Sequence, residues 1–176
     1  MDYYKEKQFI AQVDKKDKVI RNLEKWEAHK KGILHRGYTC ILTFEDKIIL
    51  QHRKHPVFDG VFDLSFSSHQ LYTNGKLQSD EEAIYDGLKR EWNLKKSDLK
   101  EKPQFIKKIY YKSKDPNSGY TEHEIDYIYI VELKNLPTPN YDFAYGFSLV
   151  DQKLITDYRL PFTPWVKVML DEKVIK

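Results

Sequence analysis

The stretch EHEIDYIYIV, residues Glu122 to Val131, predicts a β-strand that lies inside a sheet. Alternate side chains of a strand share a face, so Glu122, Glu124 and Asp126 line one side of it. Three aligned carboxylates repel one another unless a cation or basic residues lie between them, and a solvated strand face is the alternative. The apolar run from Ile128 onward favours burial, so we expect the acidic residues to have a partner.

A helix is predicted after Ser79, because Glu82 follows at the spacing of a capping box. Apolar residues then recur every fourth position, which gives the helix one stripe that faces the core. Glu91 lies beside this stripe and can point sideways from its edge. The residues of the stripe are Ile84, Leu88 and Trp92.

The remaining patterns predict several short strands and three further helices. The strands are two between Gln8 and Ile20, then Tyr38–Phe44, Ile48–His52, Phe62–Phe66, Phe105–Lys112, Glu122–Leu133 and Tyr145–Val150. The helices run from a cap at Asn22 to Lys31 before Gly32, over Asp151–Tyr158, and from a cap at Thr163 with Pro164 following. Strands mixed with helices indicate an α+β or α/β sandwich.

Length and composition are those of one soluble domain. The 176 residues carry 30 Lys+Arg against 27 Asp+Glu, a net charge of +3, and the two signs are interspersed, which argues against a general nucleic-acid binder. The sequence contains no run of about 18 apolar residues, so we expect no membrane span. The N-terminus has no apolar segment, so we expect no secretory signal there. The single cysteine, Cys40, lies in an apolar strand and suits a reducing, cytoplasmic setting.

Histidine and glutamate residues supply a candidate metal site. His29 falls near a predicted helix end, and His35 and His69 lie beside predicted strand ends. Each alone is more often a surface or core residue. Together with Glu122 and Glu124 they make a set of nitrogen and oxygen ligands that suits Zn²⁺ or Mn²⁺.

Basic and aromatic residues supply a candidate ligand pocket. Lys25, Arg53 and Lys54 could gather around a phosphate, although each alone is more often a solvated surface residue. Tyr111 and Trp165 are, taken singly, more often core or edge aromatics than site residues.

Several segments in order resemble type 1 isopentenyl diphosphate isomerase, a member of the Nudix superfamily. The resemblance extends from about Lys25 to Lys167, and its EHEIDY run is especially similar to eukaryotic-type isomerases. Its segments are Lys25–His29 (KWEAH), Gly32–Arg36 (GILHR), Ser67–Tyr72 (SSHQLY), Glu122–Tyr127 (EHEIDY) and Thr163–Trp165 (TPW). The resemblance implies one Nudix-like domain over residues 1–176, a Nudix-type α/β/α sandwich of the α+β class with a mixed sheet.

The resemblance also implies roles for individual residues. A divalent metal would be held by His29, His35, His69, Glu122 and Glu124, and Glu91 would share Mg²⁺ with a small-molecule diphosphate substrate. Lys25, Arg53 and Lys54 match diphosphate-binding positions, within a shortened Arg53–Gly60 loop. Glu124 with Tyr111 would serve the protonation of the alkene. Trp165 would face the developing tertiary carbocation, which its π-cloud stabilises.

Two departures from the family are visible. The family's catalytic cysteine falls at Ser67, and a hydroxyl is a far weaker acid than a thiol. A Nudix hydrolase would carry further glutamates in the Asp86–Leu94 helix, where Asp86, Gly87 and Arg90 stand and only Glu91 remains.

Three functions therefore stay open at this point. The first is an isopentenyl diphosphate isomerase that Ser67 weakens. The second is a divergent Nudix hydrolase of another diphosphate, and the third is a catalytically inactive domain that binds a ligand.

Overall fold

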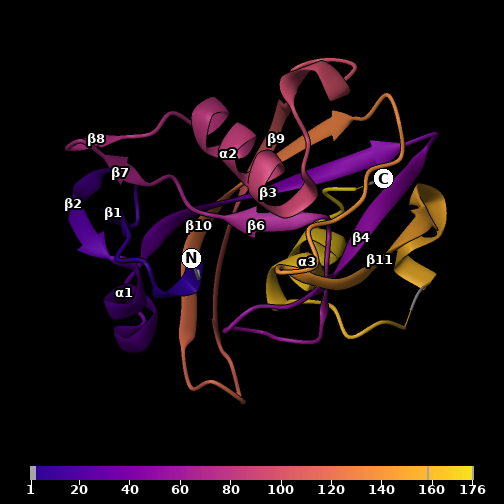
Figure 1. Ribbon diagram of the computed structural model, residues 1–176. Helices are drawn as coiled ribbons and strands as arrows, with labels where there is room; N and C mark the ends of the chain where they lie inside the picture. The colour runs from indigo at the N-terminus through magenta and orange to yellow at the C-terminus, as the bar shows by residue number, and fades with distance from the viewer. Residues whose placement is uncertain (1–2, 158, 176) are drawn as a thin grey trace.

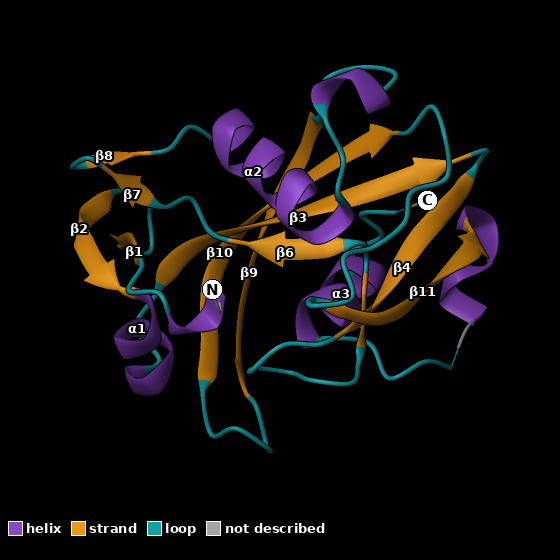
Figure 2. Ribbon diagram, in the orientation of Figure 1, coloured by secondary structure: helices purple, strands orange, loops and turns teal. Residues whose placement is uncertain are grey.

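A mixed β-sheet carries helices on both of its faces (Figures 1 and 2). The computed structural model describes residues 3–157 and 159–175. The main sheet has the order β11-β4-β3-β1-β2, with β10 pairing to β3 and to β9, and β5 and β6 pairing to β4 and β3. Its strands are β1 (Phe9–Val13), β2 (Val19–Glu24), β3 (His35–Phe44), β4 (Lys47–Arg53), β5 (Phe62–Asp63), β6 (Phe66–Ser68), β9 (Gln104–Lys114), β10 (Thr121–Glu132) and β11 (Ala144–Asp151).

Three α-helices and three 3₁₀ turns complete the described chain. The α-helices are α1 (Lys25–Lys31), α2 (Asp80–Trp92) and α3 (Pro164–Asp171). The 3₁₀ turns are η1 (Tyr3–Lys5), η2 (Lys96–Asp98) and η3 (Gln152–Asp157), and a small hairpin joins β7 (Tyr72–Thr73) to β8 (Lys76–Leu77). Within residues 3–157 and 159–175, no helix is long and apolar enough to cross a membrane.

The EHEIDYIYIV stretch forms β10, which pairs in parallel with β3 and antiparallel with β9. The register places Glu124 opposite His35 on one side and opposite Tyr111 on the other. Glu122, Glu124 and Asp126 are all buried, as the apolar run after them predicts. The three acidic side chains therefore lie on one covered face of the sheet.

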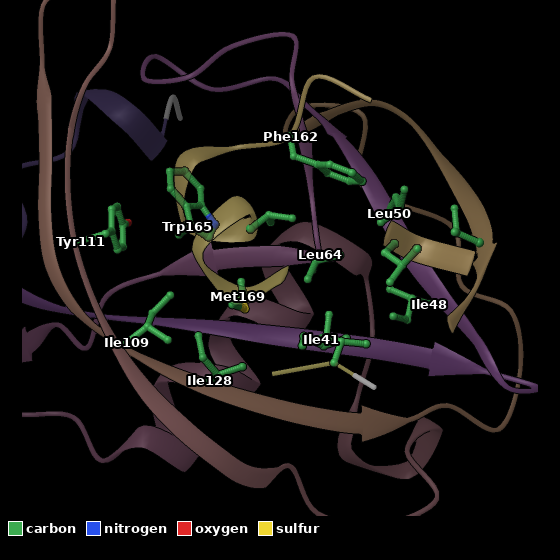
Figure 3. Packing of buried hydrophobic residues seen from close by; sticks show 14 of the residues in the cluster. Ile41, Ile48, Leu50, Leu64, Ile109, Tyr111, Ile128, Phe162, Trp165 and Met169 are labelled. Atoms are coloured by element: carbon green, nitrogen blue, oxygen red, sulfur yellow. The ribbon is translucent and has the colours of Figure 1, made fainter. Parts of the chain in front are cut away.

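The two faces of the sheet bury separate apolar clusters. Ile41 of β3 belongs to the cluster that α3 covers, and Figure 3 shows it with Ile128, Trp165 and Met169. Cys40 is directed to the opposite cluster, beneath α2. Burial raises the pKa of the Cys40 thiol, which makes it an inert core residue.

Helix α2 begins and packs as its sequence predicts. The Ser79 side chain accepts from the Glu82 backbone N–H, and the Glu82 carboxylate accepts from the Ser79 backbone in return. Ile84, Leu88 and Trp92 are buried against the sheet. A Cβ atom at Gly87 would lie 2.4 Å from the Phe66 ring and 2.6 Å from the Tyr38 hydroxyl, so the helix has no room for a larger residue there.

Three local predictions differ from the structure. Strand β2 continues to Glu24, which caps α1 in place of Asn22, because pairing with β1 holds the chain extended through Asn22. The predicted Phe62–Phe66 strand is two short strands, since Ser65 has a left-handed φ of 74°. The predicted helix at Asp151–Tyr158 is the 3₁₀ turn η3, and Tyr158 lies outside the described residues.

Candidate active site

Three histidines and two glutamates from different elements meet in the interior. Their ligand atoms all lie within 4.8 Å of one another, and all five residues are buried. We call this set the His/Glu cluster. Its members are His29 of α1, His35 at the start of β3, His69 just after β6, and Glu122 and Glu124 of β10.

Backbone carbonyl groups orient two of these imidazole rings. The Nδ1 atom of His29 lies 2.6 Å from the Lys25 carbonyl oxygen, and that of His35 lies 2.7 Å from the Ile33 carbonyl oxygen. A carbonyl only accepts, so Nδ1–H is the donor and the neutral ring presents an unprotonated Nε2 to the cluster. This arrangement is typical of histidines that ligate metals.

The inward-facing atoms of the cluster fit a divalent cation. The Nε2 atoms of His29, His35 and His69 lie 3.1, 3.2 and 2.9 Å from a carboxylate oxygen, but none has a directed hydrogen bond. Buried polar atoms without partners are rare in proteins. A cation among these atoms could be coordinated by all five side chains at once. Mixed nitrogen and oxygen ligands suit Zn²⁺ or Mn²⁺.

The cluster perturbs the acidity of its members. Burial alone would raise the pKa of Glu124, but the His35 and His69 imidazoles, whose Nε2 atoms lie 3.2 and 2.9 Å from Oε1, hold that pKa well below its usual range. Burial alone would lower the pKa of His29, yet the Glu122 carboxylate raises it. Burial dominates at His69 and lowers its pKa to about 4.

Glu124 also belongs to a second contact, with Tyr111 of β9. The Tyr111 hydroxyl donates to Glu124 Oε2 at 2.5 Å. Burial and the neighbouring carboxylate raise the pKa of Tyr111 well above its ordinary value. A Cβ atom at Gly37 would lie 2.7 Å from this carboxylate, so only glycine leaves room for Glu124 over β3.

Trp165 of α3 lies beside Tyr111, with their ring centres 5.6 Å apart (Figure 3). Its indole N–H donates to Asp63 Oδ1 at 2.9 Å, which fixes the plane of the ring. The Arg53 guanidinium lies 5.0 Å from the ring centre, within the range of a cation–π contact. The ring therefore lies in surroundings where a cation is already stabilised.

Ser67 joins a chain of hydrogen bonds among buried polar side chains. Its hydroxyl donates to Asp63 Oδ2 at 2.9 Å and lies 2.9 Å from the Thr39 hydroxyl. Thr39 in turn is 2.8 Å from Asp126 Oδ2. Burial and the nearby Glu124 charge raise the pKa of Asp126 well above its ordinary value.

One pocket, partly open to solvent, is lined by all of the predicted catalytic residues and by Glu122. Ser67, Glu124, Tyr111 and Trp165 line it, together with His69 and Glu91. The Tyr3 and Tyr4 side chains of η1 form another part of its wall. The space left inside is about 20 Å³, room for roughly one water molecule, so a larger ligand enters only when a wall moves.

Three cationic side chains line the same pocket, and we call them the cationic wall: Lys25, Arg53 and Arg90. Lys25 is buried, and its ammonium lies 4.9 Å from the Trp26 ring centre and 5.3 Å from that of Tyr3. Burial, followed by the charge of Arg90, lowers the pKa of Lys25 to about 8. Such a group holds its charge most firmly when an anion joins it.

Lys54, also predicted to bind diphosphate, lies outside this pocket. Its side chain is exposed and donates to the Tyr141 carbonyl oxygen at 3.1 Å. Arg53 and Lys54 are successive residues at the end of β4, and successive side chains of an extended chain point to opposite sides. Because Arg53 turns inward to Asp63, Lys54 turns outward.

Glu91 reaches the pocket from the last turns of α2. It accepts from Arg90 Nη2 at 2.8 Å and from Gln51 Nε2 at 3.3 Å. Asp86 of the same helix instead bonds to Gln78 at the surface. Of the acidic residues in the described part of α2, Glu91 is the one that lines the pocket.

The prediction from sequence missed Arg90, His55 and Asp63. Arg90 follows Gly87 by three positions on α2 and therefore shares a face with it, a signal that the spacing contains. Arg90 donates to Ser68 at 3.0 Å and lies 4.4 Å from the Tyr3 ring centre. No sequence signal marks His55, whose pKa burial and the Arg53 charge hold well below the ordinary value.

Comparisons with known proteins agree with the motif resemblance. The chain is 29% identical over 176 residues to isopentenyl-diphosphate delta-isomerase of Candida albicans, an alignment that covers 82% of this chain and 62% of that protein. It is 26% identical over 166 residues to isopentenyl-diphosphate delta-isomerase of Pectobacterium atrosepticum, covering 90% and 87% of the two chains. The chain thus spans less than two thirds of the Candida relative. No family model matches the sequence.

Solved structures identify the fold. A Deinococcus radiodurans protein matches with a TM-score of 0.66 over 93% of this chain and 98% of its own, at 13% identity. A MutT Nudix hydrolase from Burkholderia pseudomallei matches with a TM-score of 0.59 over 78% of this chain and 96% of its own, at 16% identity. The predicted Nudix-type α+β sandwich with a mixed sheet is confirmed.

Proposed function

We propose that this protein is an isopentenyl diphosphate isomerase, which converts isopentenyl diphosphate into dimethylallyl diphosphate. The observation that carries the proposal is the single pocket that Ser67, Tyr111, Glu124 and Trp165 share with the cationic wall. The two relatives that bear this enzyme's name support it. A small diphosphate with an apolar tail matches a pocket that is cationic on one side and aromatic on another.

The reaction adds a proton to the alkene and removes another from the far side of the developing cation. We assign the first transfer to Tyr111 with Glu124, whose oxygens lie 2.5 Å apart in the pocket wall. Trp165 faces the same space and stabilises a tertiary carbocation through its π-cloud. Ser67, which lines the same pocket, serves the removal of the second proton.

We assign the diphosphate to the cationic wall, and Mg²⁺ to Glu91 beside it. Arg90 and Glu91 are adjacent, so an anion and a cation bound there would each find an opposite charge within reach. A cation in the His/Glu cluster would supply positive charge that holds Glu122 and Glu124 together. The chain's own residues position the substrate, exclude water and move the protons.

A single experiment separates the three candidate functions. Purified protein is incubated with isopentenyl diphosphate, Mg²⁺ and either Zn²⁺ or Mn²⁺, and both dimethylallyl diphosphate and released phosphate are measured. Isomerisation by the wild type, abolished in Glu124→Gln and unchanged in Asp46→Asn, is expected. Asp46 lies in an exposed turn and is a matched surface control.

Two outcomes would overturn the proposal. Phosphate release without isomerisation would identify a Nudix hydrolase. No product from the wild type or from Ser67→Cys, with no bound metal and unchanged ligand binding in Glu122→Gln, would identify a binding domain instead.

A further inference from the structure

Asp63, in β5, is a fully buried carboxylate at the centre of the pocket's hydrogen bonds. Its exposed fraction is 0%. Oδ2 accepts from Arg53 Nη1 and from the Ser67 hydroxyl, each at 2.9 Å. Oδ1 accepts from the Trp165 indole N–H at 2.9 Å and from the Leu64 backbone N–H at 2.8 Å.

All four partners of Asp63 are donors. A protonated carboxylic acid would need an acceptor for its own O–H, so this arrangement holds Asp63 as an anion. Three of the partners, Arg53, Ser67 and Trp165, also line the pocket. Asp63 itself does not line it, so any effect on a ligand passes through these three side chains.

The contact with Asp63 decides what Ser67 can do. A serine hydroxyl has one proton, and here that proton is directed to Asp63 Oδ2. The lone pairs of Ser67 Oγ are then available to the pocket, because the Thr39 hydroxyl 2.9 Å away directs its own proton to Asp126 Oδ2. Ser67 is therefore prepared to accept a proton and has a carboxylate behind it to receive its own.

We propose that Asp63 is a positioning residue that receives, through Ser67, the proton removed from the substrate. The inference rests on the proposed isomerase function and explains how a serine could stand where the resembled enzymes have a thiol. A hydroxyl alone is a weak base, but one hydrogen-bonded to a carboxylate passes its proton on as it accepts another.

The step balances as follows in atoms and charge. The carbon–hydrogen bond beside the tertiary carbocation breaks, its electron pair forms the new double bond, and its proton goes to Ser67 Oγ. The original Ser67 proton moves to Asp63 Oδ2, which becomes neutral. The carbocation's positive charge and the carboxylate's negative charge are thereby both removed. The proton on Asp63 then returns through Ser67, which gives up a proton to water in the reopened pocket.

A double-mutant cycle between positions 63 and 67 tests this role. Asp63→Asn is made with Ser67 and with Ser67→Cys, and kcat and KM for isopentenyl diphosphate are measured. With Ser67 we expect kcat to fall about 10²–10⁴-fold while KM changes less than about 3-fold, the size of a lost proton-transfer group. With Ser67→Cys the same change should lower kcat less than about 10-fold, because a thiol takes the proton without help.

The decrease in kcat that Asp63→Asn causes both with Ser67 and with Ser67→Cys measures the weakened placement of Arg53 and Trp165. The additional decrease in kcat with Ser67 measures the proton transfer. Equal losses in the two backgrounds would overturn the inference. Asp46→Asn, in an exposed turn, controls for the change of an aspartate to its amide.

Ser67→Ala serves as a second variant if Asp63→Asn does not fold. It leaves the three other hydrogen bonds to Asp63 in place. We expect it to lose kcat to the same extent as Asp63→Asn, and wild-type activity would overturn the inference. An inactive wild type with an active Ser67→Cys would reject the role of Asp63 while still identifying the pocket as an isomerase site, whereas inactivity of both would reject both.

Discussion

The His/Glu cluster and the cationic wall border the same pocket but are held in place differently. In the cluster, strand register fixes part of the arrangement, since it sets His35 of β3 opposite Glu124 of β10. The wall consists of long side chains, and each is held by its surroundings: Arg53 by Asp63, Arg90 by Glu91, and Lys25 by aromatic rings.

Because of this difference, we expect the His/Glu cluster and the cationic wall to tolerate substitutions unequally. Removing one ligand from the cluster leaves like charges and lone pairs facing each other in a buried space. Removing one cation from the wall leaves two others and a more open anion site. We therefore expect changes in the cluster to be severe and changes in the wall to be graded.

The largest effect is expected at Glu124, which belongs to the cluster and to the proton-transfer pair with Tyr111. Glu124→Gln removes a charged ligand and the ionisable carboxylate that contacts Tyr111, so isomerisation should fall by about 10³-fold or more. Product formation at saturating substrate measures this. A decrease of less than about 10-fold would show that the cluster is not part of the reaction.

The next effect is on metal affinity. Glu122→Gln takes one carboxylate from the five ligands while leaving Tyr111 and Glu124 in contact, and we expect affinity for Zn²⁺ or Mn²⁺ to fall about 100-fold or more. Titration calorimetry and metal content after dialysis measure it. Full retention of metal would mean that the cation binds elsewhere, and Glu91→Gln is the matched variant that should keep it.

A graded effect is expected at Arg90. Arg90→Ala removes one guanidinium from the wall, and the loss of a charge-assisted contact to diphosphate corresponds to about a 10- to 100-fold rise in KM. Lys54→Ala, outside the pocket, should change KM less than about 2-fold. A larger effect at Lys54 than at Arg90 would reverse our assignment of the wall.

The smallest effect concerns pH. The pKa of Lys25 is lowered to about 8, so its ammonium loses its proton as pH rises through that value, and diphosphate affinity falls, by about 3-fold from pH 7.5 to 8.5. Lys25→Arg keeps its charge and should flatten this profile. The free energy of unfolding should rise as pH rises from 8 to 10.5, because in this range the unfolded chain binds more protons at Lys25 than the folded chain does.

The parts of the fold that follow local rules were predictable from the sequence. The Ser79 capping box and the apolar half of β10 involve neighbours in the chain, and both form as predicted. The start of α1 and the break at Ser65 were not predictable in this way. Pairing with β1 extends β2 to Glu24, and Ser65 adopts its turn while bonding to Leu42 and Ile49 of other strands.

The same distinction applies to the pocket. Ligand chemistry and motif resemblance both pointed to the five residues of the His/Glu cluster, and the structure brings all five together. Neither of them could supply Asp63, whose partners Arg53 and Trp165 come from β4 and α3 and meet it only in the folded chain. Motif resemblance also could not show that Arg53 lines the pocket and Lys54 does not. The inward direction of the Arg53 side chain depends on its ion pair with Asp63.

The parallel pairing of β3 with β10 has a consequence for how the protein is made. His29, His35 and His69 all leave the ribosome before the two glutamates of β10 that face them. Pairing of distant parallel strands is among the slow contacts of folding, because long loops must close first. The His/Glu cluster is therefore assembled late, and if it binds Co²⁺ as proposed for divalent cations, a spectroscopic signal from the ion should develop during refolding together with closure of the sheet.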